Sequence, residues 1–186
     1  MILKILSIIV FINLLSELKF THTELKFGVQ DSDTIVWSGK NKLSWKDFSG
    51  VPDDPKVYVK ASTASGIYMT RFGGIRNYHY TVKSFFIKSK SWTKVKDDYN
   101  LKHEQLHFDI SELFARKLRK SIDSLNKIGI KDKIVFKNKY KNVYLKMNNY
   151  QDKYDNEVYF NEIKQKEWIN KIASELISLK EYELEE

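Results

Sequence analysis

Two histidines and a glutamate near the middle of the chain have the spacing of a zinc-binding catalytic motif. His103 and His107 are four residues apart, and Glu104 directly follows the first of them. On an α-helix this spacing places both imidazoles on one face, about one turn apart, so that their nitrogens can bind one metal ion. Glu104 then lies roughly 100° around the helix, close enough to take a proton from a metal-bound water. The pattern predicts a zinc-dependent hydrolase.

The motif requires a helix, and the surrounding residues predict one. No Pro or Gly occurs between residues 94 and 126. The apolar residues of this stretch recur at helical spacing and form one stripe, which comprises Leu106, Ile110, Leu113, Phe114, Leu118 and Leu125. His103 and His107 fall near the middle of the stripe. A buried imidazole needs partners for its ring nitrogens, and one metal ion supplies a partner for both. The alternative is an ordinary pair of hydrogen-bonded core histidines.

A catalytic zinc needs a third protein ligand, which the motif does not contain. The chain has no Cys, and the remaining histidines, His22 and His79, lie upstream. A downstream carboxylate is therefore the better candidate. We predict Glu157 as the third ligand, because helical extrapolation places it beside the apolar face of a C-terminal helix. Asp155 falls roughly opposite and is expected to cap that helix. The alternative for Glu157 is a solvated surface acid.

The rest of the chain predicts an α+β fold. β-rich runs at residues 34–37, 43–48, 57–70 and 78–88 indicate a small antiparallel sheet in the N-terminal half, with the last two runs as a hairpin. Apolar periodicity predicts two further helices after the motif helix, one over about residues 137–154 and one beginning after Asp155. The sheet is expected to pack on about three helices, with the motif helix in the core. Residues 20–186 form one domain in this interpretation.

The first 19 residues are typical of a signal peptide. Lys4 precedes a run of apolar residues at 5–15, which is too short to cross a bilayer comfortably. We therefore expect an exported protein, located in the periplasm, the cell envelope or outside the cell. Residues 16–19 lack the pair of small residues, two positions apart, of a good cleavage site. An uncleaved N-terminal anchor is therefore the alternative, and membrane contact is expected only through this segment.

The net charge of the chain is strongly basic. There are 32 Lys and Arg against 24 Asp and Glu, a formal charge of +8. The lysines are spread along the chain and mixed with acids, which favours a solvated lysine-rich surface, and we expect no nucleic-acid partner. Attraction to anionic surfaces of the cell envelope is a weaker alternative.

Several segments in order resemble one family. The matching segments are residues 43–50, 61–67, 103–118 around the motif, and 154–157 followed by Gln165 and Trp168. Together they resemble the bacterial family of predicted secreted zinc-dependent proteases, a domain of otherwise unknown function. The resemblance implies a zincin-like fold, Zn²⁺ bound by His103 and His107, and a peptide or protein substrate. The family pattern continues to a His-Gly pair where this chain has Phe160 and Asn161, so either Glu157 completes the site or zinc binding is weakened.

The function expected from the sequence is that of an exported zinc peptidase. Zinc-bound water attacks a peptide carbonyl, and Glu104 acts as general base. The substrate is expected to add to a sheet edge as an extended strand. Tyr154 and Tyr159 are candidates to stabilise the oxyanion. The alternative is a catalytically degenerate, non-enzymatic binding domain of the cell envelope that retains the protease fold.

Overall fold

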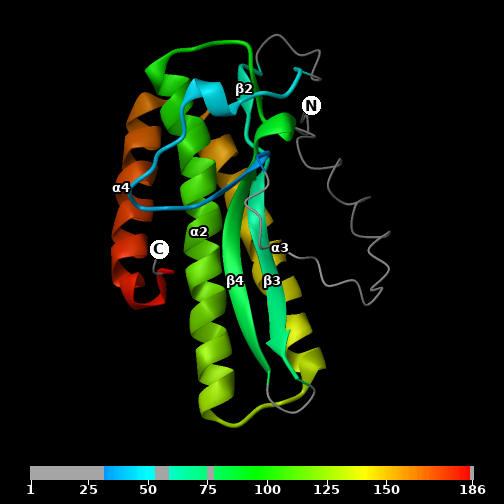
Figure 1. The fold of residues 1–186 in the computed structure, drawn as a ribbon. Coiled ribbons are helices and arrows are strands. Elements are labelled where there is room, and N and C mark those ends of the chain that lie inside the picture. Colours follow the sequence, from blue (N-terminus) through cyan, green and yellow to red (C-terminus); the bar gives the residue numbers. More distant parts are fainter. Residues whose placement is uncertain (1–31, 53–58, 75–77, 185–186) are drawn as a thin grey trace, which may run out of the picture. The chain divides into compact units, whose positions relative to one another are not determined.

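The computed structural model describes residues 32–52, 59–74 and 78–184. The predicted signal peptide, residues 1–19, and His22 lie outside these ranges. The described residues form an α+β domain, as predicted, which combines a small antiparallel sheet with three α-helices (Figure 1). No described helix combines the length and the apolar character needed to cross a membrane.

The main sheet has three antiparallel strands in the order β1-β4-β3. They are β1 Thr34–Val36, β3 Ser65–Gly73 and β4 Tyr78–Ile87. The predicted hairpin is confirmed, because β3 and β4 pair from Gly73 with Tyr78 along to Ser65 with Phe86. The residues before Ser65 do not extend this hairpin. They form β2 Ala61–Ser62, which pairs with β5 Trp92–Thr93 in a separate two-stranded sheet.

The alternating run at residues 43–48 is not a strand, contrary to the prediction. Trp45–Asp47 forms the 3-10 helix η1, because Ser44 and Asp47 satisfy one another's backbone groups. The Asp47 carboxylate accepts hydrogen bonds from the backbone N–H of Ser44 at 2.8 Å and from its hydroxyl at 2.9 Å. Leu43 and Phe48 are still buried, in a small cluster with Phe86 and Phe108. A second 3-10 helix, η2 Lys88–Lys90, follows β4.

Helix α2, Asp98–Lys127, carries the motif, and the sequence signals for its two ends are clear. At its start the side chain of Asp97 accepts a hydrogen bond from the backbone N–H of Asn100. At its end Gly129 adopts a φ of 77°, a left-handed conformation that closes helices and favours glycine. The predicted stripe is the core-facing side of the helix, where Ile110, Leu113 and Leu118 are fully buried.

The break between the two C-terminal helices falls later in the sequence than predicted. Helix α3 runs over Lys133–Val158 and helix α4 over Glu162–Ser178, followed by η3 Lys180–Tyr182. The prediction that Asp155 caps the last helix is wrong: Asp155 lies inside α3, and Asn161 caps α4 by accepting a hydrogen bond from Lys164 N–H. Buried Tyr154 and Val158 carry the apolar stripe of α3 past Asp155.

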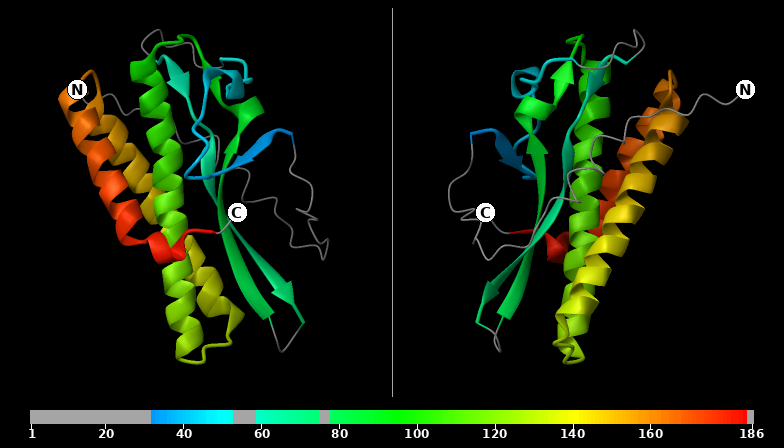
Figure 2. Two further views of the ribbon diagram at one scale, coloured as in Figure 1. Left: turned by 60° about the vertical axis from the view of Figure 1, so that its left-hand side comes forward. Right: turned by 90° about the vertical axis from the view of Figure 1, so that its right-hand side faces the viewer.

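Phe160 marks the break between α3 and α4. Its φ of 51° lies in the left-handed region, which costs an L-residue about 1–2 kcal/mol. Helix α2 occupies the centre of the domain, where it contacts both long strands and both other helices (Figure 2). The motif helix therefore lies in the core, as predicted.

Candidate metal site

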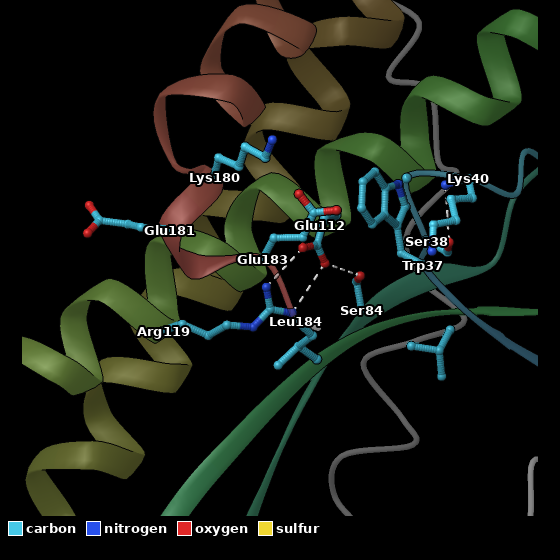
Figure 3. A pocket seen from close by; sticks show the side chains of 12 residues that line it. Trp37, Ser38, Lys40, Ser84, Glu112, Arg119, Lys180, Glu181, Glu183 and Leu184 are labelled. Atoms are coloured by element: carbon cyan, nitrogen blue, oxygen red, sulfur yellow. Dashed lines mark hydrogen bonds and ion pairs between the residues drawn. The ribbon is translucent and has the colours of Figure 1, made fainter. Parts of the chain in front are cut away.

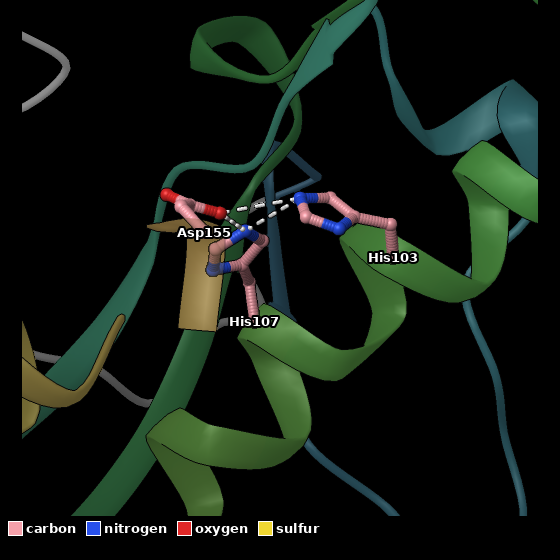
Figure 4. Close-up of side chains that lie close together, drawn as sticks. All are labelled: His103, His107 and Asp155. Carbon is pink, nitrogen blue, oxygen red and sulfur yellow. Dashed lines mark hydrogen bonds and ion pairs between the residues drawn. The ribbon is translucent and has the colours of Figure 1, made fainter. Parts of the chain in front are cut away.

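Helix α2 presents the two motif histidines as neighbours on one face. Their ring centroids lie 4.8 Å apart, and the two Nε2 atoms are separated by 3.1 Å. Both rings are partly buried, because α3 packs along this part of α2. The close approach of two Nε2 atoms is the arrangement expected of ligands that share one ion (Figure 4).

The third group in reach of these nitrogens is Asp155, from the last turns of α3. Its Oδ1 lies 3.2 Å from Nε2 of His103 and 2.9 Å from Nε2 of His107. Among the described residues, these three are the one group of His, Asp or Glu side chains close enough together to hold a metal ion. Ligands about 2.0–2.1 Å from a tetrahedral zinc are about 3.3 Å apart, so a shift of a few tenths of an ångström would admit the ion.

Glu157, the third ligand predicted from sequence, is not brought to the histidines. Its Oε2 accepts a hydrogen bond from Nε1 of Trp168 at 2.9 Å, and its Oε1 lies 3.6 Å from Nζ of Lys153. Because α3 continues to Val158, positions 155 and 157 point about 160° apart, and only Asp155 faces α2. The structure therefore brings Asp155, and not Glu157, close to the two histidines.

Gln151 determines which nitrogen of His107 carries a proton. One turn before Asp155 on α3, its Nε2 donates a hydrogen bond to the backbone carbonyl of His107 at 3.0 Å. A carbonyl can only accept, so this contact fixes the orientation of the amide. The amide oxygen then faces Nδ1 of His107 at 2.5 Å, and Nδ1 must be the donor. In the neutral ring, Nε2 of His107 therefore presents its lone pair to Asp155.

This tautomer leaves two acceptors in contact unless a cation lies between them. Nε2 of His107 and Oδ1 of Asp155 are 2.9 Å apart. A proton on Nε2 of His103 can satisfy one of them but not both. Either a metal ion or a second proton on His107 has to complete the group. The donor set, two imidazoles and one carboxylate, is suited to zinc and to other first-row divalent metals.

The same contacts govern the charge of the metal-free group. Burial disfavours the charged imidazole of His107 and lowers its pKa. The Asp155 carboxylate, with smaller contributions from Glu104 and the hydrogen bond to Gln151, outweighs burial and raises this pKa from 6.5 to about 9. Burial raises the pKa of Asp155, but the two histidines outweigh this effect and hold the pKa well below its usual range.

Glu104, the predicted general base, is buried with one oxygen left without a partner. Its side chain is only 4% exposed, and Oε2 has no hydrogen-bond partner among the described residues. The carboxylate is close enough to act electrostatically on both His107 and Tyr154. A buried carboxylate oxygen without a protein partner needs a water molecule or a ligand atom beside it. This is the second observation that fits a hydrolytic metal site.

Tyr154 packs directly on both histidines. Its ring stacks on His103 with centroids 4.8 Å apart and meets His107 edge-on at 5.0 Å. Its hydroxyl lies 3.5 Å from the backbone carbonyl of His103, as a donor, and burial raises its pKa above the ordinary value. Tyr159, the other tyrosine considered for the oxyanion, is 54% exposed and its ring contacts Phe160.

Strand β3 begins at the motif helix. The hydroxyl of Ser65 lies 2.9 Å from that of Ser111 and donates to the carbonyl of His107 at 3.4 Å. Thr63, just before the strand, donates to the carbonyl of Glu104 at 3.3 Å. These contacts bring one end of an edge strand beside the histidines. His79 is exposed on β4 and stacks on Phe72.

The metal affinity should depend on Gln151, which sequence reasoning did not single out. We expect Gln151→Leu to lower the zinc affinity about 10- to 100-fold, because the variant loses the hydrogen bond that holds the ring and tautomer of His107. Competition with a chelating dye measures the change. Gln165→Leu is a matched control: it removes a hydrogen bond to the carbonyl of Tyr99 without contacting either histidine. Equal zinc affinity in wild type and Gln151→Leu would contradict this role.

A second polar cluster lies on another side of α2 and has a structural role. Glu112 is 2% exposed and binds Arg116 at 3.0 Å and Arg119 at 2.9 Å. Its other oxygen accepts from the Ser84 hydroxyl at 2.6 Å (Figure 3). The cluster lines a surface hollow to which neither the motif histidines nor Asp155 contribute. Because the carboxylate of Glu112 is fully occupied, we assign it a structural role.

The fold and the site together define an α+β domain that carries a His-His-Asp group of possible metal ligands. Comparison of the chain with models of protein families, with curated proteins and with solved structures finds no match.

Proposed function

We propose that the protein is an exported zinc peptidase, with Zn²⁺ bound by His103, His107 and Asp155. The observation that carries the proposal is the convergence of three ligand atoms within 3.2 Å of one another. The hydrogen bond to Gln151 turns the lone pair of His107 Nε2 towards Asp155 in the neutral ring, where a zinc ion can bind it. The buried, unpartnered oxygen of Glu104 in the same motif supports hydrolysis over a purely structural metal site.

The chain's own residues have separate roles in this proposal. A bound zinc supplies Lewis-acid chemistry, because it lowers the pKa of a water molecule towards about 7 and polarises a carbonyl. Glu104 accepts the proton of the attacking water on its free oxygen and delivers it to the leaving nitrogen. Asp155 balances part of the positive charge. Gln151 and Tyr154 hold the two imidazoles in position from α3.

A zincin-like arrangement and a peptide substrate belong to the same proposal. They are supported by the resemblance of the motif region to predicted secreted zinc-dependent proteases, and by the position of β3. Among the described residues β3 pairs with β4 alone, so that no strand occupies its other edge, and the carbonyl of Ile67 in β3 accepts a hydrogen bond from the hydroxyl of Tyr140 at 3.1 Å. Ser65 ties the first residue of β3 to the motif helix. An extended peptide that adds to this edge would pass close to His107.

Export is proposed on the apolar run at residues 5–15 and the lysine before it.

The resemblance implies a histidine at the position of Phe160. Its replacement does not remove the third ligand in this proposal, because Asp155 supplies it. Phe160 itself is 75% exposed.

One observation favours a second candidate, a non-enzymatic domain without metal. Protonation of His107 would also satisfy the contact with Asp155, and the carboxylate of Asp155 favours that proton, because it raises the pKa of His107 to about 9. In this alternative the two histidines and Asp155 form a partly buried ion pair that stabilises the packing of α2 on α3.

Zinc titration separates the two candidates. We expect uptake of about one zinc per chain with release of a proton, because the metal must displace the proton from His107. The pKa of about 9 lies above neutral pH, so raising the pH removes the competing proton. The apparent affinity should therefore rise about tenfold per pH unit between pH 7 and 8. Competition with a chelator at each pH measures the slope. Absence of uptake at pH 8 would leave only the ion-pair alternative.

A further inference from the structure

Lysines are concentrated in the first part of α3 and in the turn before it. Residues 131–146 contain six lysines and a single acid, Asp132. The lysines are Lys131, Lys133, Lys137, Lys139, Lys141 and Lys146. The acids of α3 occur only from residue 152 onwards, near the candidate metal site. Lysines and acids are mixed over most of the chain, but along this one helix the lysines are concentrated in the first part and the acids in the last.

The lysines flank a ridge on the solvent side of α3. Phe136, Val143 and Met147 face the core and are buried. Ile134 and Leu145 fall on the opposite side by helical spacing, and they are 65% and 53% exposed. All six lysines except Lys139 are exposed, and they lie on either side of this apolar ridge.

This charge pattern opposes the stability of the helix. Asp132 caps the start of α3 by accepting a hydrogen bond from the N–H of Ile134, but the first turn itself contains no acid and begins with Lys133. Lys133, Lys137 and Lys141 are spaced four residues apart, so that each repels the next. No ion pair with another described residue compensates any of the six lysines; Lys133 lies 5.9 Å from the ring centroid of Tyr78. A pattern that weakens its own helix indicates a partner that supplies the missing negative charge.

We propose that this face of α3 binds the surface of an anionic lipid bilayer. Aliphatic side chains between lysines suit a membrane surface, where Ile134 and Leu145 enter the headgroup region and the lysines extend to phosphates. Nucleic acid is the less favoured polyanion, because α3 contains no Arg and presents aliphatic rather than aromatic groups on this ridge. Asp155 lies about 21 Å beyond Lys141 along the helix axis, so the bound protein keeps the candidate metal site outside the contact.

A single fluorescent probe tests where the protein touches the membrane. The chain has no Cys, so Asn138→Cys places one label on the ridge of α3, and Asn170→Cys places a matched label on the exposed side of α4. With phosphatidylglycerol vesicles we expect an environment-sensitive dye to shift to the blue at position 138 and not at 170. With phosphatidylcholine vesicles we expect no shift at position 138. A blue shift at both positions, or at neither, would overturn the proposal.

Charge variants test the role of the lysines independently of the probe's position. Each lysine at an anionic membrane contributes about a fivefold increase in binding, so Lys137→Gln, Lys141→Gln and Lys146→Gln combined should weaken the response of the 138 label about a hundredfold. A control variant with Lys102, Lys120 and Lys166 all replaced by Gln has the same net charge, and its 138 label should respond almost as strongly as that of the unsubstituted protein. An equal loss of binding in both triple variants would show that only the net charge matters. A response to duplex DNA but not to vesicles would show that this face of α3 binds nucleic acid. Either result contradicts the proposal.

Discussion

Asp155→Asn should lower the zinc affinity by more than about a hundredfold, whereas Glu157→Gln should leave it unchanged. Removal of a ligand has a larger effect than removal of the hydrogen bond that positions one, which costs about 10- to 100-fold. The asparagine keeps the size of the side chain but loses the negative charge that balances the metal. Glu157→Gln is the matched control, because its carboxylate binds Trp168 instead. The affinity of each variant is measured by competition with a chelator.

The same pair of variants distinguishes the structure from the sequence-based assignment. If Glu157→Gln loses zinc and Asp155→Asn retains it, then α3 must end earlier than Val158 and the predicted ligand is the true one. If neither variant changes the affinity, the zinc lies elsewhere and the His-His-Asp group is a partly buried ion pair. His103→Ala provides the positive control, because its imidazole belongs to the site under both assignments.

The sequence was sufficient to predict the parts of the site that depend on one helix. The spacing of His103 and His107, the absence of Pro and Gly around them and the apolar stripe predicted a buried motif helix, and α2 confirms it. The hairpin was also predicted, since β3 and β4 lie in two β-rich runs that follow one another along the chain. Local spacing decides these features, and local spacing can be read from one sequence.

The contribution of α3 could not be predicted in the same way. The choice between Asp155 and Glu157 depended on where α3 ends, and the break falls at Phe160, a residue type that rarely adopts a left-handed conformation. Buried Tyr154 and Val158 were the available signal, because they extend the stripe of Phe136, Val143 and Met147. Gln151 had no signal at all, since its role comes from contacts with a residue 44 positions away on another helix.

Glu104→Gln should abolish peptide hydrolysis while zinc remains bound. General base catalysis contributes about 10²- to 10⁴-fold to such reactions, and an amide cannot accept the proton that the carboxylate takes. The side chain is 4% exposed, and the amide has nearly the same volume, so the core should not be disturbed. Hydrolysis is measured on a broad peptide library with the zinc content determined on the same samples. Glu162→Gln, at the exposed first turn of α4, is the control for an acid lost at the surface.

The thermal stability of Glu104→Gln is a second measurement, and it should change in the opposite direction if Glu104 has only a structural role. A buried carboxylate oxygen without a partner destabilises the fold by about 1–3 kcal/mol. A neutral amide is less costly to bury, so Glu104→Gln should melt at the same temperature as wild type or higher. Residues kept for chemistry commonly show this opposition between stability and activity. Lower stability together with unchanged hydrolysis would mean that the carboxylate supports the packing of α2 and takes no part in proton transfer.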